Sequence, residues 1–343
     1  MISMRIAEPR LRGLATSLLE QRGVPPAAAW LQADLLIQAE LRNLPSHGLQ
    51  HLPRLLARID RGLADPSATG THRWRRRGLL DVEGERALGP VAVMAALEAL
   101  APVIEDTGLA LAAIRNANHI GMLGYYVEQA AIRGLIGIVL STSEALVHPF
   151  GGTKAVLGTN PIAIGMPTGT APFVLDLATS LVPMGKIHDH ALRGQNLQPG
   201  WAVDADGSPT IDPEAAKSGA IAPFGGVKGY GLGLAFELLV AALAGSDLAP
   251  EIRGTLDATH PVNKGDVLIL IDPGADDGLM ARLAAYLDAL RVSRPADINR
   301  PVAIPGDGMR ARRSAALRDG IELPEAVFNE LQALQAACPR PKG

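Results

Sequence analysis

The first sixty residues of the chain place apolar side chains at the spacing of an amphipathic helix. Leu11, Leu14 and Leu18 lie three or four residues apart, so they share one face of a helix. The same kind of spacing predicts a further helix over Pro26–Leu41. Asp, Pro, Ser and Gly residues between positions 65 and 70 interrupt this pattern, and they predict the end of the helical segment near residue 63.

From residue 79 onward, short continuous apolar runs alternate with helical spacing. Such runs are typical of strands buried on both faces, and their alternation with helices predicts an α/β fold. The predicted strands are residues 79–82, 109–114, 135–140, 162–166, 173–175 and 267–271, and the predicted helices are residues 90–104, 121–133, 230–244, 279–292 and 324–337. The helix at 230–244 is strongly apolar, so we expect it at the centre of the fold.

These patterns divide the chain into two domains, for which 343 residues are sufficient. We expect residues 1–75 and 280–343 to pack together as a helical domain, and residues 76–279 to form the α/β domain. The basic run Thr71–Arg77 is compatible with a phosphate-binding patch. Basic residues also discourage association through the edge of a sheet, and we favour an edge strand here.

Composition narrows the class of protein. The chain is 48% hydrophobic, which is typical of a globular protein, and its net charge of 32 − 35 = −3 gives no reason to expect binding to nucleic acid or to anionic membranes. The single cysteine, Cys338, excludes a disulfide within the chain and favours a reducing, cytoplasmic location. The first twenty residues lack the apolar core of a signal peptide, and no apolar run reaches the length of a membrane span.

The polar stretch Pro45-Ser46-His47-Gly48 follows the Pro26–Leu41 helix and carries candidate chemistry. Ser46 is a good N-cap for a helix at residues 49–61, and His47 would then lie near the positive end of that helix as a neutral imidazole. Such a histidine suits acid–base catalysis. The simpler alternative is a capping serine beside a surface histidine. Adjacent side chains rarely align for proton transfer, so we do not expect a hydrolase dyad.

A second polar stretch, from Asn116 to Tyr126, contains His119 and two glycines. No Gly-x-Gly-x-x-Gly follows a predicted strand and no phosphate-loop sequence occurs, so an ordinary dinucleotide fold is excluded. His188 and His190 are two residues apart without a third ligand at a usual spacing, which favours a solvated pair over a metal site.

Several short motifs, taken in order along nearly the whole chain, resemble those of one family, the malate/L-lactate dehydrogenases. This family includes sulfolactate, ureidoglycolate and diketogulonate dehydrogenases and cyclic-imine carboxylate reductases. The motifs are Pro45-Ser-His-Gly48, Arg115-Asn-Ala-Asn-His119 with Gly124-Tyr-Tyr126, Pro149-Phe-Gly-Gly152, Leu157-Gly-Thr-Asn-Pro-Ile-Ala163, Asp176-Leu-Ala-Thr179, Gly185-Lys-Ile187 and Pro223-Phe-Gly-Gly-Val-Lys-Gly-Tyr-Gly231.

The resemblance implies a homodimeric NAD- or NADP-dependent oxidoreductase with a non-Rossmann, three-layer α/β/α cofactor domain and no metal. It implies that His47 donates a proton to the substrate with support from Ser46. It also implies that His119 is a catalytic residue, which lies at the nicotinamide and serves as the acid–base group in some members. The implied cofactor-binding residues are His119, Ile120, Gly121, Met122, Leu123, Ser141, Thr142, Asp176, Leu177, Ala178, Lys228, Gly229, Gly306 and Asp307. The implied substrate-binding residues are His51, Arg54, Thr159 and Met184.

The chain departs from the family pattern at three of these positions. His51 and Met184 stand where many members carry arginines, and Asp307 stands where glutamate is usual. We therefore expect a weaker, pH-dependent carboxylate anchor at His51, unless Arg54, one helical turn later, makes the contact instead.

Three functions remain open at this point. The first is interconversion of a small 2-hydroxyacid, such as malate, lactate or sulfolactate, and its 2-oxoacid. The second is reduction of the C=N bond of a cyclic imine carboxylate, and the third is a binding protein that has lost turnover. For the dimer, we expect an exposed apolar stripe of Val327, Leu331 and Leu334 on the last helix.

Overall fold

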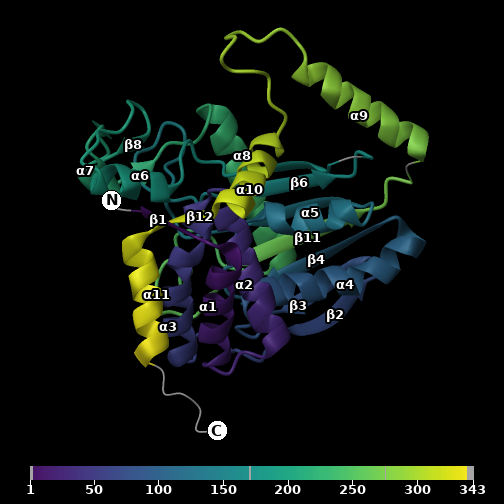
Figure 1. Ribbon diagram of the computed structural model, residues 1–343, viewed down its shortest axis with the longest axis horizontal. Coiled ribbons are helices and arrows are strands. Elements are labelled where there is room, and N and C mark those ends of the chain that lie inside the picture. Colours follow the sequence, from purple (N-terminus) through teal and green to yellow (C-terminus); the bar gives the residue numbers. More distant parts are fainter. Residues whose placement is uncertain (1–2, 170, 275, 338–343) are drawn as a thin grey trace.

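A mixed seven-stranded sheet lies at the centre of the computed structural model, which describes residues 3–169, 171–274 and 276–337 (Figure 1). In spatial order its strands are β2 (Thr71–Arg76), β3 (Leu79–Glu83), β4 (Leu109–Arg115), β11 (Gly265–Ile271), β5 (Ile136–Ser141), β6 (Ile162–Met166) and β7 (Phe173–Leu177). Strands β3 and β4 run parallel, and the other neighbouring pairs run antiparallel. The predicted strands thus lie in one sheet, with the basic strand β2 exposed at its edge.

Helices cover both faces of this sheet. Helices α4 (Gly89–Thr107) and α5 (Gly124–Ile132) share a core with Leu268 of β11, whereas α8 (Val227–Ala244) packs on the neighbouring Val267 through Val240. Successive residues of a strand point to opposite faces, so α8 lies on the other side of the sheet from α4 and α5.

The two ends of the chain meet beside the sheet. Strand β1 (Ser3–Ile6) pairs antiparallel with β12 (Ile321–Pro324), and one apolar core joins α1 (Glu8–Glu20), α2 (Pro26–Leu41), α3 (Leu52–Asp60) and α11 (Glu325–Ala337). Figure 1 shows these helices side by side. The domain boundaries expected from the sequence stay a prediction, and β2 crosses the first of them by pairing with β3.

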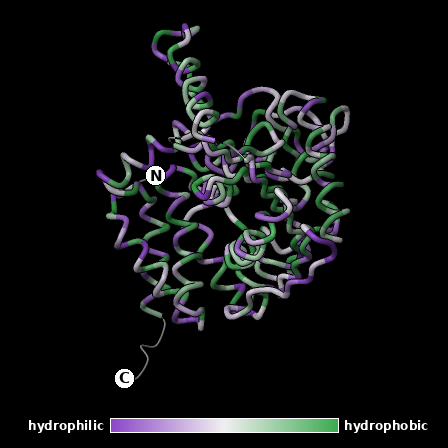
Figure 2. Tube along the Cα trace, turned by 90° about the vertical axis from the view of Figure 1, so that its right-hand side faces the viewer, coloured by the Kyte–Doolittle hydropathy of each residue, from purple (hydrophilic) through white to green (hydrophobic). Residues whose placement is uncertain are grey.

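Several elements were not expected from the sequence pattern. A small sheet of β8 (Ala202–Val203), β9 (Pro209–Thr210) and β10 (Ala220–Ile221) packs with α6 (Met184–Leu192) and α7 (Pro213–Lys217), and α10 (Asp307–Asp319) follows a long loop. Helix α9 (Asp277–Arg291) and that loop stand off from the rest of the molecule in both Figure 1 and Figure 2.

Helix α8 lies at the surface, contrary to the central position expected for residues 230–244. One side packs on the sheet, but Leu232, Leu238 and Leu239 are 44%, 54% and 43% exposed. Within the described part of the chain, α8 is the helix long and apolar enough to cross a membrane, and 28% of it is buried. Its Glu237 is buried and accepts a hydrogen bond from Asn160 Nδ2 at 2.7 Å, which ties the helix to the sheet domain.

The apolar stripe expected to be exposed on α11 is instead used within the chain. Leu331 is fully buried, and Val327 and Leu334 pack against the same core as helices α1 and α3. The expectation of an exposed surface there was therefore wrong, because the paired chain ends cover the stripe. Cys338 lies outside the described residues.

The close approach of α4 to the segment that carries His119 leads to a first prediction. A Cβ on Gly89 would lie 2.2 Å from the backbone oxygen of His119, so Gly89→Ala must displace that segment. We expect a loss of about 1–3 kcal/mol in the free energy of unfolding, measured in urea, together with reduced activity. The matched control is Gly13→Ala, because a Cβ there meets nothing within 4 Å and alanine favours the α1 helix. Equal stability of the two variants would contradict the prediction.

Candidate active site

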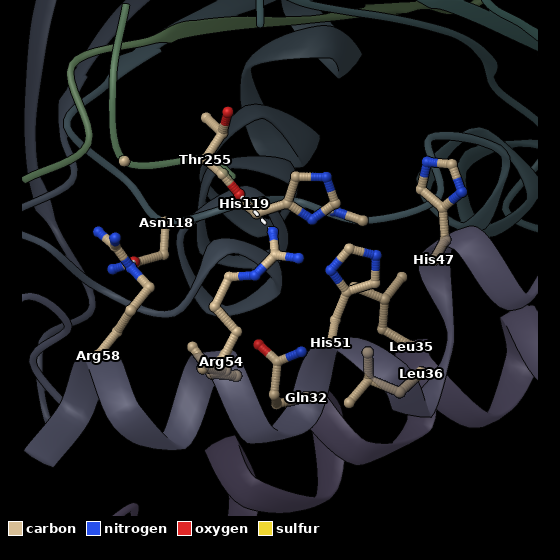
Figure 3. A pocket seen from close by; sticks show the side chains of 13 residues that line it. Gln32, Leu35, Leu36, His47, His51, Arg54, Arg58, Asn118, His119 and Thr255 are labelled. Atoms are coloured by element: carbon tan, nitrogen blue, oxygen red, sulfur yellow. Dashed lines mark hydrogen bonds between the residues drawn. The ribbon is translucent and has the colours of Figure 1, made fainter. Parts of the chain in front are cut away.

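Three histidines from two distant segments meet in one cavity (Figure 3). His47 and His51 come from the connection between α2 and α3, and His119 comes from the segment after β4. The ring centroid of His119 lies 6.0 Å from that of His47 and 5.4 Å from that of His51, and both pairs are stacked. The two stretches singled out in the sequence are therefore brought together by the fold.

The Ser46–His47 turn differs from the N-cap expected for it. Residues Pro45–His47 form a 3-10 turn (η1) and Leu49–His51 a second one (η2), with Gly48 at the N-cap position and no side-chain cap. Ser46 Oγ instead forms a 3.0 Å hydrogen bond with His47 Nδ1. The expectation that these adjacent side chains would not align was wrong, because the tight turn brings them to the same side. The bond leaves Nε2 of His47 for another partner.

A buried carboxylate, that of Glu40, fixes this turn through a hydrogen bond to its backbone. Glu40, near the end of α2, accepts a 2.7 Å hydrogen bond from the backbone N–H of Leu49. A Cβ on Gly48 would lie 2.0 Å from Glu40 Oε1, so glycine is required where the turn passes over the carboxylate. Burial raises the pKa of Glu40 to about 7.

Burial also keeps the histidines neutral. Desolvation, followed by repulsion from His51, lowers the pKa of His47 to about 4. The pKa of His119 is lowered well below its usual value by desolvation and then by the charges that His51 and His47 would carry. The His119 ring is exposed toward the cavity, and the protein packed around the cavity still lowers its solvation. At neutral pH the three imidazoles are therefore unprotonated.

Two arginines on consecutive turns of α3 line the same cavity but differ in how far they are already bonded. Arg58 is buried, and it donates to Asn118 Oδ1 at 2.8 Å and to the carbonyls of Asp257 and His260. Arg54 donates a single hydrogen bond, from Nη1 to the carbonyl of Thr255 at 3.1 Å. The Arg54 guanidinium therefore retains donors for an anion in the cavity.

His51 lies in the cavity as expected, but its contacts do not favour a charged anchor. Its Nε2 donates to the carbonyl of Ser46, and its ring stacks on His119. Desolvation lowers the pKa of His51, an effect that the hydrogen bond to Ser46 opposes and that Arg54 reinforces. Between the two residues proposed to bind the carboxylate, Arg54 carries its charge at every pH of interest.

A buried polar network supports the His119 segment. Asp176 Oδ2 accepts from the N–H of Gly124 at 2.6 Å, where α5 begins, and burial raises the pKa of Asp176 to about 6. Ser141 Oγ donates to Asp266 at 2.6 Å, and Lys264, which is fully buried, pairs with the same carboxylate. The first contact ties β7 to the start of α5, and the second joins the end of β5 to β11.

Four of the residues expected to bind the cofactor line two cavities. His119 and Gly121 line the first, which encloses about 500 Å³ including its mouth. Met122 and Gly306 line the second, of about 260 Å³, together with Arg42 and Arg310. Ile120 and Leu123 belong to the apolar core, and Ser141 and Thr142 are buried.

The remaining candidates line neither cavity. Asp307 is clamped by Arg291 at 2.8 Å and 2.9 Å, which lowers its pKa to about 2. Lys228 and Gly229 lie in the first turn of α8, and Leu177 and Ala178 follow Asp176. Thr159 is held by its N–H, which donates to Ser143 Oγ at 3.0 Å. Met184 begins α6, whose Gly185 closely approaches Ser46.

Sequence reasoning missed several residues that build the first cavity. Gln32, Leu35 and Leu36 come from α2, and Gly254 and Thr255 come from the loop before β11. A signal existed for Arg58, which follows Arg54 at helical spacing. The others carry no local pattern that distinguishes them from core or loop residues.

The residues of this cavity are typical of a site for proton transfer on a small anion. A neutral histidine can exchange a proton, and an arginine with free hydrogen-bond donors can hold the anion. Comparison with known proteins then identifies the family. The family model for malate/L-lactate dehydrogenase matches residues 6–332, so the chain belongs to this family of oxidoreductases.

Individual relatives agree with that membership. The chain is 35% identical to (2R)-3-sulfolactate dehydrogenase (NADP(+)) of Chromohalobacter salexigens, covering 97% of each. It is 33% identical to delta(1)-pyrroline-2-carboxylate reductase 2 of Burkholderia multivorans, covering 94% of this chain and 95% of the relative. The crystal structure of a dehydrogenase from Sinorhizobium meliloti superposes with a TM-score of 0.94 at 64% identity, covering 97% of this chain and 98% of that one.

Proposed function

We propose that this protein is an NAD(P)-dependent oxidoreductase that interconverts a small 2-hydroxyacid and its 2-oxoacid. The observation that carries the proposal is the neutral Ser46–His47 pair in one cavity with Arg54. A 2-hydroxyacid presents a hydroxyl to be deprotonated and a carboxylate to be held, and these two groups match the two sides of the cavity. The sulfolactate dehydrogenase among the relatives supports the substrate class.

A nicotinamide cofactor fits the residues on the page. Gly121 adopts a φ of +71° and lies against Leu35. The absence of a side chain there leaves space beside His119 for a flat ligand to approach the backbone. The second cavity lies at the start of α10 and is lined by Arg42 and Arg310, each paired with a carboxylate, Glu128 and Asp307 respectively. We propose that the free backbone N–H groups at the N-terminus of α10 meet the phosphate groups there. We propose that the sheet with helices on both faces is the cofactor domain, with a non-Rossmann strand order. When bound, the nicotinamide accepts or donates the hydride.

The protein residues then transfer the proton and orient the substrate. In oxidation, His47 Nε2 accepts the hydroxyl proton, and Ser46 fixes the ring through Nδ1. In reduction, the same nitrogen returns the proton to the oxygen. Arg54 holds the carboxylate by a charge-assisted hydrogen bond, and His119 forms the opposite wall of the cavity.

Reduction of a cyclic imine carboxylate is the second candidate function. It is favoured by the similarity to the pyrroline-2-carboxylate reductase, and it uses the same carboxylate anchor and proton donor. Oxidation of NADPH or NADH with a panel of 2-oxoacids and cyclic imines distinguishes the two functions. Whether NAD or NADP serves this chain is decided by the same assay.

We further propose a cytoplasmic homodimer that associates through α8. This helix exposes apolar surface at Leu232, Leu238 and Leu239. Phe150, which lies beside the start of α8, is 60% exposed. A second copy of the chain would cover this surface, in preference to a membrane or a nucleic acid. The net charge of −3 agrees with that preference.

The role of His47 is tested by His47→Gln. Glutamine keeps the polarity of the site but cannot exchange a proton, so kcat should fall by about 10²–10⁴-fold. The Kd for NAD(P)H, measured by fluorescence, should change little. A variant with near-normal kcat would remove His47 from the mechanism.

The carboxylate anchor is tested by measuring KM for the 2-oxoacid from pH 6 to 8. Because the pKa of His51 is lowered, the parent KM should be nearly flat over this range. Arg54→Ala should raise KM by about 10–100-fold at every pH, since it removes a charged hydrogen bond. Arg61→Ala, on the exposed end of the same helix, is the control. A parent KM that rises with pH, with little effect of Arg54→Ala, would show protonated His51 to be the anchor.

The proposed interface is tested by Leu238→Glu with light scattering. The parent should have the mass of a dimer, and the variant should dissociate because a carboxylate is buried without a partner. Ile132→Glu is the matched control, since Ile132 is 66% exposed at the end of α5, and it should remain dimeric. A monomeric parent, or a dimeric Leu238→Glu, would contradict the proposal.

A further inference from the structure

The side-chain amide of Gln32 faces the first cavity and has no hydrogen-bond partner among the residues that the structure describes. Its side chain comes from α2, the residue is 4% exposed, and it lines the first cavity. Figure 3 shows its amide rising between Arg54 and His51. Gln38, two turns later on the same helix, instead bonds to Asp34 and to two arginines. The difference points to a role for Gln32 toward whatever occupies the cavity.

Apolar and polar side chains meet around the amide of Gln32, which lies between Arg54 and His51. Leu35, Leu36 and Leu55 line the cavity beside it. An amide that faces a cavity without a protein partner is free to bond to a ligand, and a ligand that displaces solvent there has to supply a hydrogen-bond partner. An amide both donates and accepts, which matches a hydroxyl or a carboxamide better than a hydrocarbon group.

The charges of the cavity limit what else the ligand carries. Arg54 has free donors, but Arg58 is saturated by Asn118 and by backbone carbonyls. The histidines are neutral near pH 7. Among the described lining residues, one guanidinium is thus left for one carboxylate, and a second carboxylate would lie beside neutral groups.

We propose that Gln32 is a specificity-determining residue that selects monocarboxylates carrying a neutral hydrogen-bonding group on the chain beyond C2. The proposal rests on the oxidoreductase function proposed above. Arg54 binds the carboxylate, and His47 transfers the proton of the oxygen on C2. Gln32 forms a hydrogen bond with a hydroxyl or amide further along the substrate. Dicarboxylates and purely apolar acids are then the poorer substrates.

The test compares two 2-oxoacids of equal size, 4-hydroxy-2-oxobutanoate and 2-oxopentanoate, which differ in a terminal hydroxyl or methyl group. Oxaloacetate represents the second carboxylate. In the parent, kcat/KM should favour the hydroxylated acid over the other two by about 10-fold. Gln32→Met keeps the length of the side chain without the amide, and it should bring the hydroxyl-to-methyl ratio near 1.

Gln332→Met is the matched control, because Gln332 is exposed on α11, and it should keep the parent ratio. An unchanged ratio in Gln32→Met, or a parent that prefers oxaloacetate, would overturn the proposal. A higher Kd for NAD(P)H in Gln32→Met with the ratio unchanged would also overturn it, because Gln32 would then contact the cofactor.

Failure of the oxidoreductase function is recognised separately. If neither acid is turned over by any variant, the proposed function fails, and the selectivity of the cavity is then measured by calorimetric titration of the same two acids. Tighter binding of the hydroxylated acid by the parent, but not by Gln32→Met, supports the role of Gln32. Equal binding of the two acids by the parent overturns it.

Discussion

The site depends on one electrostatic constraint: three imidazole rings within 6.5 Å of one another do not carry their charges together where the surrounding protein reduces their solvation. Desolvation lowers the pKa of each ring, and mutual repulsion adds to it for His47 and His119. The cluster is consequently neutral near pH 7. Positive charge for an anion then has to come from a group that does not titrate, and Arg54 supplies it from the next turn of α3.

Helix α2 is the common support of this arrangement. Along one helix, Gln32 and Leu35 line the first cavity, Glu40 holds the turn that carries His47, and Arg42 lines the second cavity. Leu35 also packs against Gly121, so the helix and the His119 segment are fixed relative to each other. The position of the proton-transfer group and the shape of both cavities are thereby set by the packing of a single helix.

Much of the fold could be predicted from the sequence, because local periodicity reports local structure. The helix at Pro26–Leu41 and the strands of the central sheet occur where apolar spacing predicts them. The same spacing cannot tell which partner covers an apolar face. Helix α8 was therefore expected at the centre although it lies at the surface, and the stripe on α11 was expected at the surface although it is buried.

For the site, the sequence by itself predicted which residues carry the chemistry, from two histidine motifs in the order of one family, with His51 in place of an arginine. The tertiary structure decided which of these residues contact one another and which line the cavity. Ser46 bonds to His47 because a 3-10 turn aligns them, and Arg54 has free donors because Arg58 takes the carbonyls around it. Gln32 has no motif at all. It reaches the cavity because α2 packs against the turns η1 and η2 that carry His47 and His51, and contacts between distant segments leave no trace in local sequence.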